Sequence, residues 1–386
     1  YHCAFCFGRY EETPPEKARI VRTADGSWHT LVGVGAAEMY DTVAEFRRIP
    51  NLFEILPLDY WQANYNYEIP TQVAARRDAY LATPSGRKHV LAVVRAKLAA
   101  AGFSSKELAG LHDVELESYA DAFFASGHDV IVARRHYADG ARTTNDLASS
   151  GALTPEEHGH YIAMTVETMR DLYRKYPQAK YVAAFQNWLR PAGASFDHLH
   201  KQLVTIDERG VTAERELVKV AKEPDIYQRL AVNYAIAHDL VVAENSHAIA
   251  FAGFGHRFPT LEIFSKAKAN FPWKHHPHAI RAMADLIHAC HVATGPQIAC
   301  NEEWYYRPPD TEVAMPWRVL IKWRISTLAG FEGGTKINVN TISPYDLRRR
   351  ALTRLHRERD RLAPGVQLGD ECDAKPNCLQ YEKTKN

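Results

Sequence analysis

The chain has 386 residues, of which 46% are hydrophobic and 24% charged, a composition typical of globular proteins that excludes wholesale disorder. Lys and Arg number 47 against 46 Asp and Glu, so there is no basic excess of the kind that attracts nucleic acid or an anionic membrane. No apolar run approaches the roughly 20 residues that a membrane-spanning helix needs. At roughly 150 residues per domain, the length predicts two or three domains.

The first motif along the chain is the pair Cys3 and Cys6. Six cysteines are too few for a disulfide scaffold in a chain this long, and we predict a cytoplasmic protein, in which such a pair is more often a metal site or a redox pair. The two-residue gap lets both thiolates reach one tetrahedral Zn²⁺, which needs two further nitrogen or sulfur ligands. Histidines would supply them, but spacing cannot select two among 19. A reduced surface pair or a redox motif is the alternative.

Several strands and one long helix are predicted between residues 128 and 206. Apolar, β-branched runs predict strands at 128–133, 181–185 and 199–206. Thr154 followed by Pro155 and Glu157 has the pattern of a helix start, and the helix should run to about Tyr176.

The second half of the chain shows the same mixture of elements. Alternating apolar residues over 317–325 predict a half-buried strand, and Ser343 with Pro344 opens a basic helix. Interspersed strands and helices, with several antiparallel pairs, indicate an α+β fold. The polar stretch 207–212 is a candidate boundary, so we predict an N-terminal half, 1–210, and a C-terminal half, 211–386.

The clearest candidate for chemistry lies at the third predicted strand, with His198 just before it and His200 and Gln202 within it. Side chains alternate along a strand, so these three share one face. An imidazole on a rigid strand can attack phosphorus when a hydrogen bond holds its other nitrogen. Gln202 can donate to a phosphoryl oxygen but cannot shuttle a proton, and Ser195 and Asn187 could add neutral donors. The alternative is two histidines that merely pack on a sheet face.

Taken in order, these segments resemble the galactose-1-phosphate uridylyltransferase family, the transferase branch of the histidine triad superfamily. That family carries Phe-x-Asn, Gly-x-Ser and His-x-His-x-Gln motifs after an upstream Cys-x-x-Cys. The matching segments here are Cys3–Cys6, Phe185–Asn187, Gly193–Ser195 and His198–Gln202. Arg48–Phe53 resembles the nucleoside-contacting strand of the family, and Ala329–Thr335 resembles the loop that reaches the sugar phosphate.

The resemblance implies two histidine-triad-like halves, each an antiparallel sheet packed with helices, and a homodimer. It implies a zinc site made of Cys3, Cys6, His136 and His198, with His128 as an alternative third ligand. It also implies that His200 is a covalent nucleophile. The other implied roles are phosphoryl-oxygen binding by Gln202, Ser195 and Asn187, ribose or base contact by Asn51, and sugar binding by Glu332.

Two departures from the family pattern bear on a second metal and on the sugar substrate. Some members bind a second metal through a glutamate that matches Glu216 and through histidines, but the segment compared with their His-Trp-His reads Pro316-Trp317-Arg318. We therefore predict no second metal and expect Glu216 to form a salt bridge. Ser326 stands where a basic residue is common, which weakens the case for galactose 1-phosphate.

The predicted function is nucleotidyl transfer between a nucleotide sugar and a sugar phosphate through a nucleotidyl-histidine. One alternative is a phosphorylase, in which inorganic phosphate accepts the nucleotidyl group from a nucleotide sugar or a dinucleoside polyphosphate. An alternative of another class is a nucleotide-binding regulatory or assembly protein without turnover. The base, the sugar and the acceptor stay open.

Overall fold

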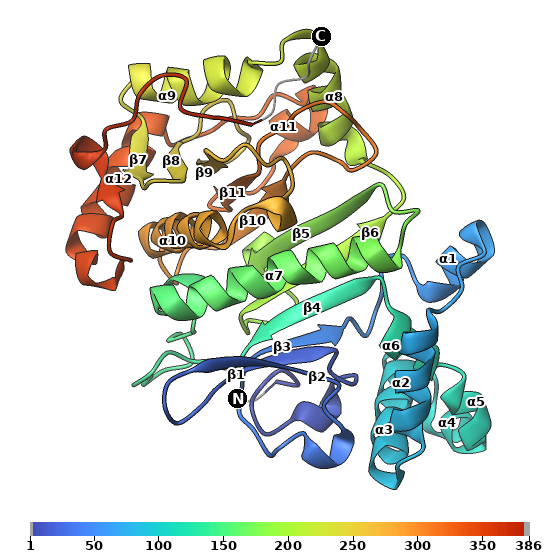
Figure 1. Cartoon of the computed structure of the whole chain (residues 1–386). Coiled ribbons are helices and arrows are strands. Elements are labelled where there is room, and N and C mark those ends of the chain that lie inside the picture. The colour runs from blue at the N-terminus through green and yellow to red at the C-terminus, as the bar shows by residue number, and fades with distance from the viewer. Residues whose placement is uncertain (1–2, 382–386) are drawn as a thin grey trace. The chain divides into compact units, whose positions relative to one another are not determined.

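Two units, interleaved along the chain, are built from antiparallel strands and helices in the computed structural model (Figure 1). The structure describes residues 3–381. The first unit comprises residues 3–136, 168–183 and 200–207, and the second comprises the remaining described residues. The α+β fold is thus confirmed. The division into two histidine-triad-like halves, 1–210 and 211–386, stays a prediction. It concerns similarity between the halves, whereas the two units are defined by contacts.

The first unit is organised around five antiparallel strands, in the order β2-β1-β3-β4-β6. These strands are β1 (Ala18–Arg22), β2 (Trp28–Val32), β3 (Ala44–Pro50), β4 (His128–Ala133) and β6 (His200–Ile206). A buried carboxylate fixes the inner strands, because Asp129 on β4 forms ion pairs of 2.6 Å with both Lys17 and Arg48. All six residues of β4 are buried, which places this strand inside the unit.

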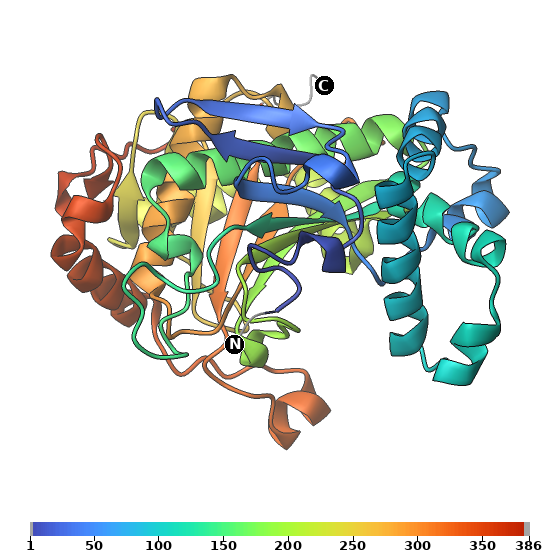
Figure 2. The same cartoon turned by 90° about the horizontal axis from the view of Figure 1, so that it is seen from below.

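Six helices fill the long connection between β3 and β4, and Figures 1 and 2 show them grouped beside the ends of these strands. They are α1 (Leu58–Tyr65), α2 (Thr71–Leu81), α3 (Pro84–Ala100), α4 (Ser105–Gly110), α5 (Asp113–Glu117) and α6 (Ala120–Ala125). Val90 and Val94 on α3 are fully buried against Phe123 of α6. The group therefore has its own apolar core, which burial of such side chains stabilises.

The second unit has its own antiparallel strands, in the order β12-β7-β8-β9-β11-β10-β5. They are β5 (Tyr181–Trp188, of which 184–188 belong here), β7 (Val241–Glu244), β8 (Ala248–Ala252), β9 (Thr260–Ser265), β10 (Cys300–Tyr305), β11 (Arg318–Trp323) and β12 (Gln367–Leu368). Helix α10 (Pro277–Thr294) packs on β8, β9 and β11, and α12 (Pro344–Arg357) packs on α10 (Figure 1). The remaining helices are α7 (Pro155–Lys175, of which 155–167 belong here), α8 (Gly210–Lys222), α9 (Asn233–Ala237) and α11 (Gly330–Thr335).

Local sequence signals place several elements correctly. Strand β4 has the predicted bounds, β5 runs three residues farther than the predicted 181–185, and β6 begins at His200 rather than at 199. Helix α7 begins at Pro155 as predicted, because Glu157 N–H donates to Thr154 Oγ1 (3.2 Å) and Thr154 N–H donates to Glu157 Oε2 (2.7 Å). This reciprocal pair is a capping box.

The half-buried strand predicted over 317–325 is wrong in its burial and its end. Strand β11 stops at Trp323, and all of its residues except Lys322 are buried. It lies between β9 and β10 and packs against α10, so its alternating pattern does not correspond to a solvent-exposed face. Among the described residues, no helix has the length and apolar character needed to cross a membrane.

Candidate active and metal site

Four buried side chains can hold a metal ion: Cys3, Cys6, His136 and His198 offer ligand atoms that all lie within 4.8 Å of one another. The sulfur atoms of Cys3 and Cys6 are 3.8 Å apart. Nδ1 of His136 is 3.7 Å from the Cys3 sulfur and 3.2 Å from the Cys6 sulfur. Two sulfurs bound to one tetrahedral zinc at about 2.3 Å would lie about 3.8 Å apart, so the donor set fits this ion.

A tight turn aims the two thiols the same way. The carbonyl oxygen of Cys3 accepts a hydrogen bond from Cys6 N–H at 3.0 Å, and the Cys6 carbonyl accepts from Arg9 N–H at 3.2 Å. Burial raises the pKa of the Cys3 thiol to about 11. A thiolate in this position therefore needs a cation beside it, which a bound zinc ion would supply.

His200 lies at the start of β6, beside the cysteine turn. Strand β6 pairs with β4, so that Val132 lies opposite His200 and Val130 lies opposite Gln202. His200 is only 5% exposed, and its ring centroid is 5.4 Å from that of Phe5, one of the two residues between the cysteines. His200 and Gln202 stand two residues apart on one face of a paired strand, as predicted. His198, which was predicted to share that face, precedes the strand, because β6 begins at His200.

His128 lies with Gln202, while His136 lies with the cysteines. The backbone N–H of Ile55 donates to Nδ1 of His128 at 3.3 Å, so the ring proton belongs on Nε2, which donates to Oε1 of Gln202 at 3.0 Å. Nδ2 of Asn51 lies 2.9 Å from the same ring nitrogen and donates to Gln202 Oε1 at 3.4 Å. Burial lowers the pKa of His128 from 6.5 to about 4, so the ring is neutral at pH 7.

The consequence for Gln202 is a fixed amide orientation. Its Oε1 is occupied by His128 and Asn51, and in the described part of the chain its Nε2 group has no hydrogen-bond partner. An amide held by its oxygen presents its N–H groups outward, and N–H groups are what an anionic oxygen accepts from. The sequence did not point to His128 in this supporting role.

Asn187 has a parallel arrangement in the second unit. It lies on β5 opposite Asn301 of β10, and Asn301 Nδ2 donates to Asn187 Oδ1 at 2.7 Å and to the carbonyl of Ala192 at 2.8 Å. The Nδ2 donor of Asn187 is thereby turned away from Asn301. Gly193, at φ +88°, closes the following turn. The partnership of Asn187 with Asn301 could not be predicted from local sequence, because the pairing of β5 with β10 joins distant segments.

The remaining predicted residues have simpler surroundings. Ser195 is exposed after the Gly193 turn. Glu332 is partly buried on α11, where its carboxylate accepts from Ala329 N–H at 3.1 Å. The salt bridge expected for Glu216 is confirmed, since its carboxylate lies 2.5 Å from the Arg318 guanidinium and accepts from Tyr227 at 2.8 Å.

Comparison with known proteins gives a family and a fold. The family described as "Domain of unknown function (DUF4921)" matches residues 1–381. No curated protein matches the chain. Among solved structures, ADP-glucose phosphorylase from Arabidopsis thaliana, with ADP-glucose bound, is similar at TM-score 0.58 and 17% identity, over 91% of this chain and 89% of that one.

Two further structures share the fold. A GalT-like protein from Arabidopsis thaliana has TM-score 0.59 and 18% identity, with 91% of each chain covered. A uridylyltransferase has TM-score 0.50 and 16% identity, over 60% of this chain and 75% of that one. At these identities the similarity establishes the fold, and the chemistry has to be argued from the residues.

Proposed function

Because the chain belongs to the DUF4921 family, whose description names no activity, we propose its function from the candidate site: it transfers the nucleotidyl group of a nucleotide sugar through a covalent bond to His200. The observation that carries the proposal is the pair His200 and Gln202 on one strand face, with the Gln202 amide fixed by His128. The order of motifs shared with the uridylyltransferase family supports it.

The proposed reaction has two displacements at phosphorus. In the first, a ring nitrogen of His200 attacks the α-phosphorus and forms a nitrogen–phosphorus bond as the bond to the sugar phosphate oxygen breaks. The sugar phosphate leaves as a stable anion, so no strong general acid is required at the position of Gln202. In the second, an oxygen of the acceptor phosphate attacks the same phosphorus, and His200 is released with its electron pair.

The donors around the nucleophile would hold the phosphoryl oxygens as charge develops. Gln202 offers the N–H groups that His128 leaves outward, and Asn187 and Ser195 are the further donors we assign. Asn51 would contact the ribose or base, and Glu332 a sugar hydroxyl. A zinc ion held by Cys3, Cys6, His136 and His198 would be a closed four-ligand structural ion without an open position for substrate.

The acceptor we assign first is a sugar phosphate. The second candidate is inorganic phosphate, and the whole-chain similarity to an ADP-glucose phosphorylase supports it. Both reactions share the covalent His200 intermediate and differ only in the attacking oxygen. A homodimer, a cytoplasmic location and the absence of a second metal stay predictions.

The test is covalent labelling of the full chain. The protein is incubated with UDP-glucose, ADP-glucose or GDP-mannose carrying a labelled α-phosphate, then denatured and assayed for label that is stable in base and labile in acid. We expect label on the wild type and on His356→Ala, which removes an exposed histidine of α12, and none on His200→Ala, with the melting temperature confirming the fold.

The chase identifies the acceptor. Glucose 1-phosphate or inorganic phosphate is added to the labelled protein, and the one that removes the label with formation of a nucleotide product is the acceptor. Label that persists on His200→Ala would overturn the assigned nucleophile. Tight binding of a nucleotide without labelling or turnover would favour the regulatory or assembly protein.

A further inference from the structure

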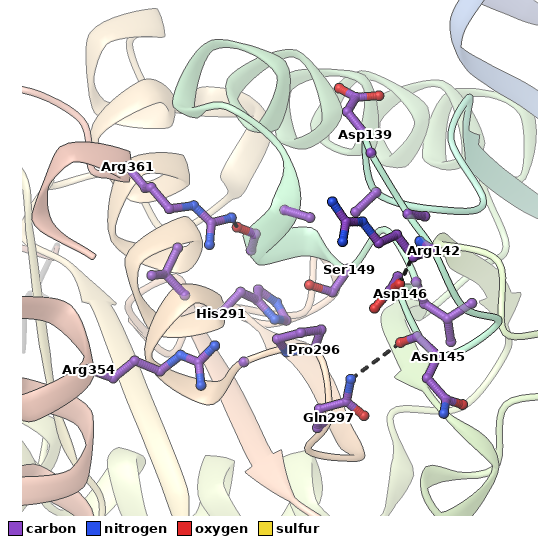
Figure 3. Close-up of a pocket in the computed structure, with 18 residues that line it drawn as sticks. Asp139, Arg142, Asn145, Asp146, Ser149, His291, Pro296, Gln297, Arg354 and Arg361 are labelled. Atoms are coloured by element: carbon purple, nitrogen blue, oxygen red, sulfur yellow. Dashed lines mark hydrogen bonds between the residues drawn. The ribbon is translucent and has the colours of Figure 1, made fainter. Parts of the chain in front are cut away.

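A cavity of about 390 Å³ lies in the second unit, apart from the residues assigned to catalysis (Figure 3). Its walls are the loop 138–152, the C-terminal end of α10 with the turn that follows it, and two arginines from the C-terminal part of the chain. The loop is ordered by its own contacts, because Asp146 Oδ2 accepts from the backbone N–H groups of Arg142 and Thr143 at 2.8 Å each. The volume is within the range of small-molecule sites.

Three arginines from separate segments line this cavity, and Figure 3 shows Arg142, Arg354 and Arg361 around it. Arg361 has protein partners, since it donates to the Gly151 carbonyl and lies 3.3 Å from the Glu358 carboxylate. Unlike Arg361, the guanidinium groups of Arg142 and Arg354 have no hydrogen bond or ion pair within the described residues. Nε of Arg354 is buried and unpartnered.

The chain is shaped to hold Arg354 in this position. Its guanidinium lies against Gly295, where an added Cβ would come within 2.6 Å of Arg354 Cζ. Gly295 also has φ +82°, a conformation that disfavours other residues. Burial lowers the pKa of Arg354, as do Arg357 and Arg361, against the opposite effect of Glu358. A partly buried cation near like charges is stabilised when an anion joins it.

The acidic groups near the cavity are engaged elsewhere. Asp146 is occupied by the backbone of its own loop, which lowers its pKa and keeps it ionised. Glu358 lies between Arg361 and Arg357. The Asp139 carboxylate stands at the edge of the cavity, turned away from Arg354 and Arg361 in Figure 3. The cations that face the cavity therefore exceed the carboxylates that neutralise them.

We propose that this cavity binds a small molecule through a phosphate or diphosphate group held by Arg142, Arg354 and Arg361. Guanidinium groups pair with phosphate oxygens through parallel N–H donors. Several guanidinium groups around one anion offer more donors than the two oxygens of a carboxylate can accept, which favours a phosphate. The site lies outside the nucleophile and its donors, so it is a second ligand site and not part of the proposed transfer reaction.

The test is calorimetric titration of the full chain with pyrophosphate, with inorganic phosphate and malonate as separate arms. We expect pyrophosphate to bind most tightly, and Arg354→Gln and Arg142→Gln each to weaken it about tenfold or more, because each removes charge-assisted hydrogen bonds. Arg350→Gln is the matched control, since it removes an exposed arginine one turn earlier on α12, and it should change the affinity less than about twofold. Gln202→Ala should likewise leave the affinity unchanged.

Four outcomes would overturn the proposal. The first is that the wild type fails to bind pyrophosphate, or binds malonate as tightly. The second is that Arg350→Gln weakens binding as much as Arg354→Gln, which would indicate nonspecific attraction. The third is that Gln202→Ala abolishes binding, which would place the anion at the catalytic residues. The fourth is that Arg354→Gln lowers the melting temperature while no variant changes the affinity for pyrophosphate. The Arg354 guanidinium would then only complement the helix dipole at the C-terminal end of α10.

Discussion

Nε2 of His128 donates a hydrogen bond of 3.0 Å to Oε1 of Gln202, across the paired strands β4 and β6. The histidine is neutral and buried, and its other nitrogen accepts from Ile55. The bond engages the amide oxygen of Gln202 and leaves its N–H groups for a phosphoryl oxygen in the proposed reaction. In that reaction His128 would act as a positioning residue for Gln202.

Replacing Gln202 tests the donor itself. Gln202→Ala should lower kcat by about 10²–10³, the usual effect of losing one donor to developing charge, while His200→Ala abolishes labelling. Gln62→Ala removes an exposed glutamine of α1 and should leave kcat unchanged. Steady-state kinetics on the substrate identified by labelling would measure this. A Gln202→Ala enzyme with wild-type kcat would contradict the assigned role.

Replacing His128 separates positioning from metal binding. His128→Ala should lower kcat about tenfold, because the loss of one hydrogen bond of ordinary strength frees the Gln202 amide. His128→Gln can still donate to Oε1 from its own amide and should recover part of that loss. Zinc content should stay near that of the wild type in both variants. Loss of zinc would make His128 a ligand and exclude the positioning role.

The pH dependence of stability follows from the same histidine. Its pKa falls from 6.5 to about 4 on folding because burial disfavours the charged ring. The unfolded chain therefore binds the proton more readily, and the stability contributed by neutral His128 is complete above pH 6.5 and is lost as the pH falls toward 4.

The measurement is urea unfolding of the wild type and His128→Gln at pH 7 and pH 5. Between pH 7 and pH 5 the free energy of unfolding of the wild type should fall by about 2 kcal/mol more than that of the variant, as linkage predicts from the folded and unfolded pKa of His128. Parallel losses in both proteins would show that His128 does not titrate as its burial indicates.

The metal group predicts a coupled loss of zinc and stability. The purified protein should contain about one zinc per chain, and Cys6→Ser should lose the metal and lower the melting temperature, since binding energy at a structural site contributes to folding. His198→Ala should behave in the same way. Cys372→Ser removes a partly exposed cysteine outside the group and should keep both properties. Metal analysis by mass spectrometry decides the point, and zinc-free wild-type protein would contradict it.

Sequence alone determined what depends on neighbouring residues. The Thr154–Glu157 capping box fixed the start of α7, a run of β-branched residues fixed β4, and alternation put His200 and Gln202 on one face. Each feature arises from interactions within a few residues, so local pattern is sufficient to specify it. The interspersed strands and helices predicted along the chain also indicated the α+β fold, which the structure has.

Tertiary structure decided everything that joins distant segments. The sequence left His128 and His136 as rival metal ligands, and only folding shows that His128 binds Gln202, 74 positions away, while His136 joins Cys6, 130 positions away. The partnership of Asn187 with Asn301 and the burial of β11 depend in the same way on which strands pair. A local pattern cannot specify these contacts, because they form only when chain closure, strand order and packing bring remote residues together.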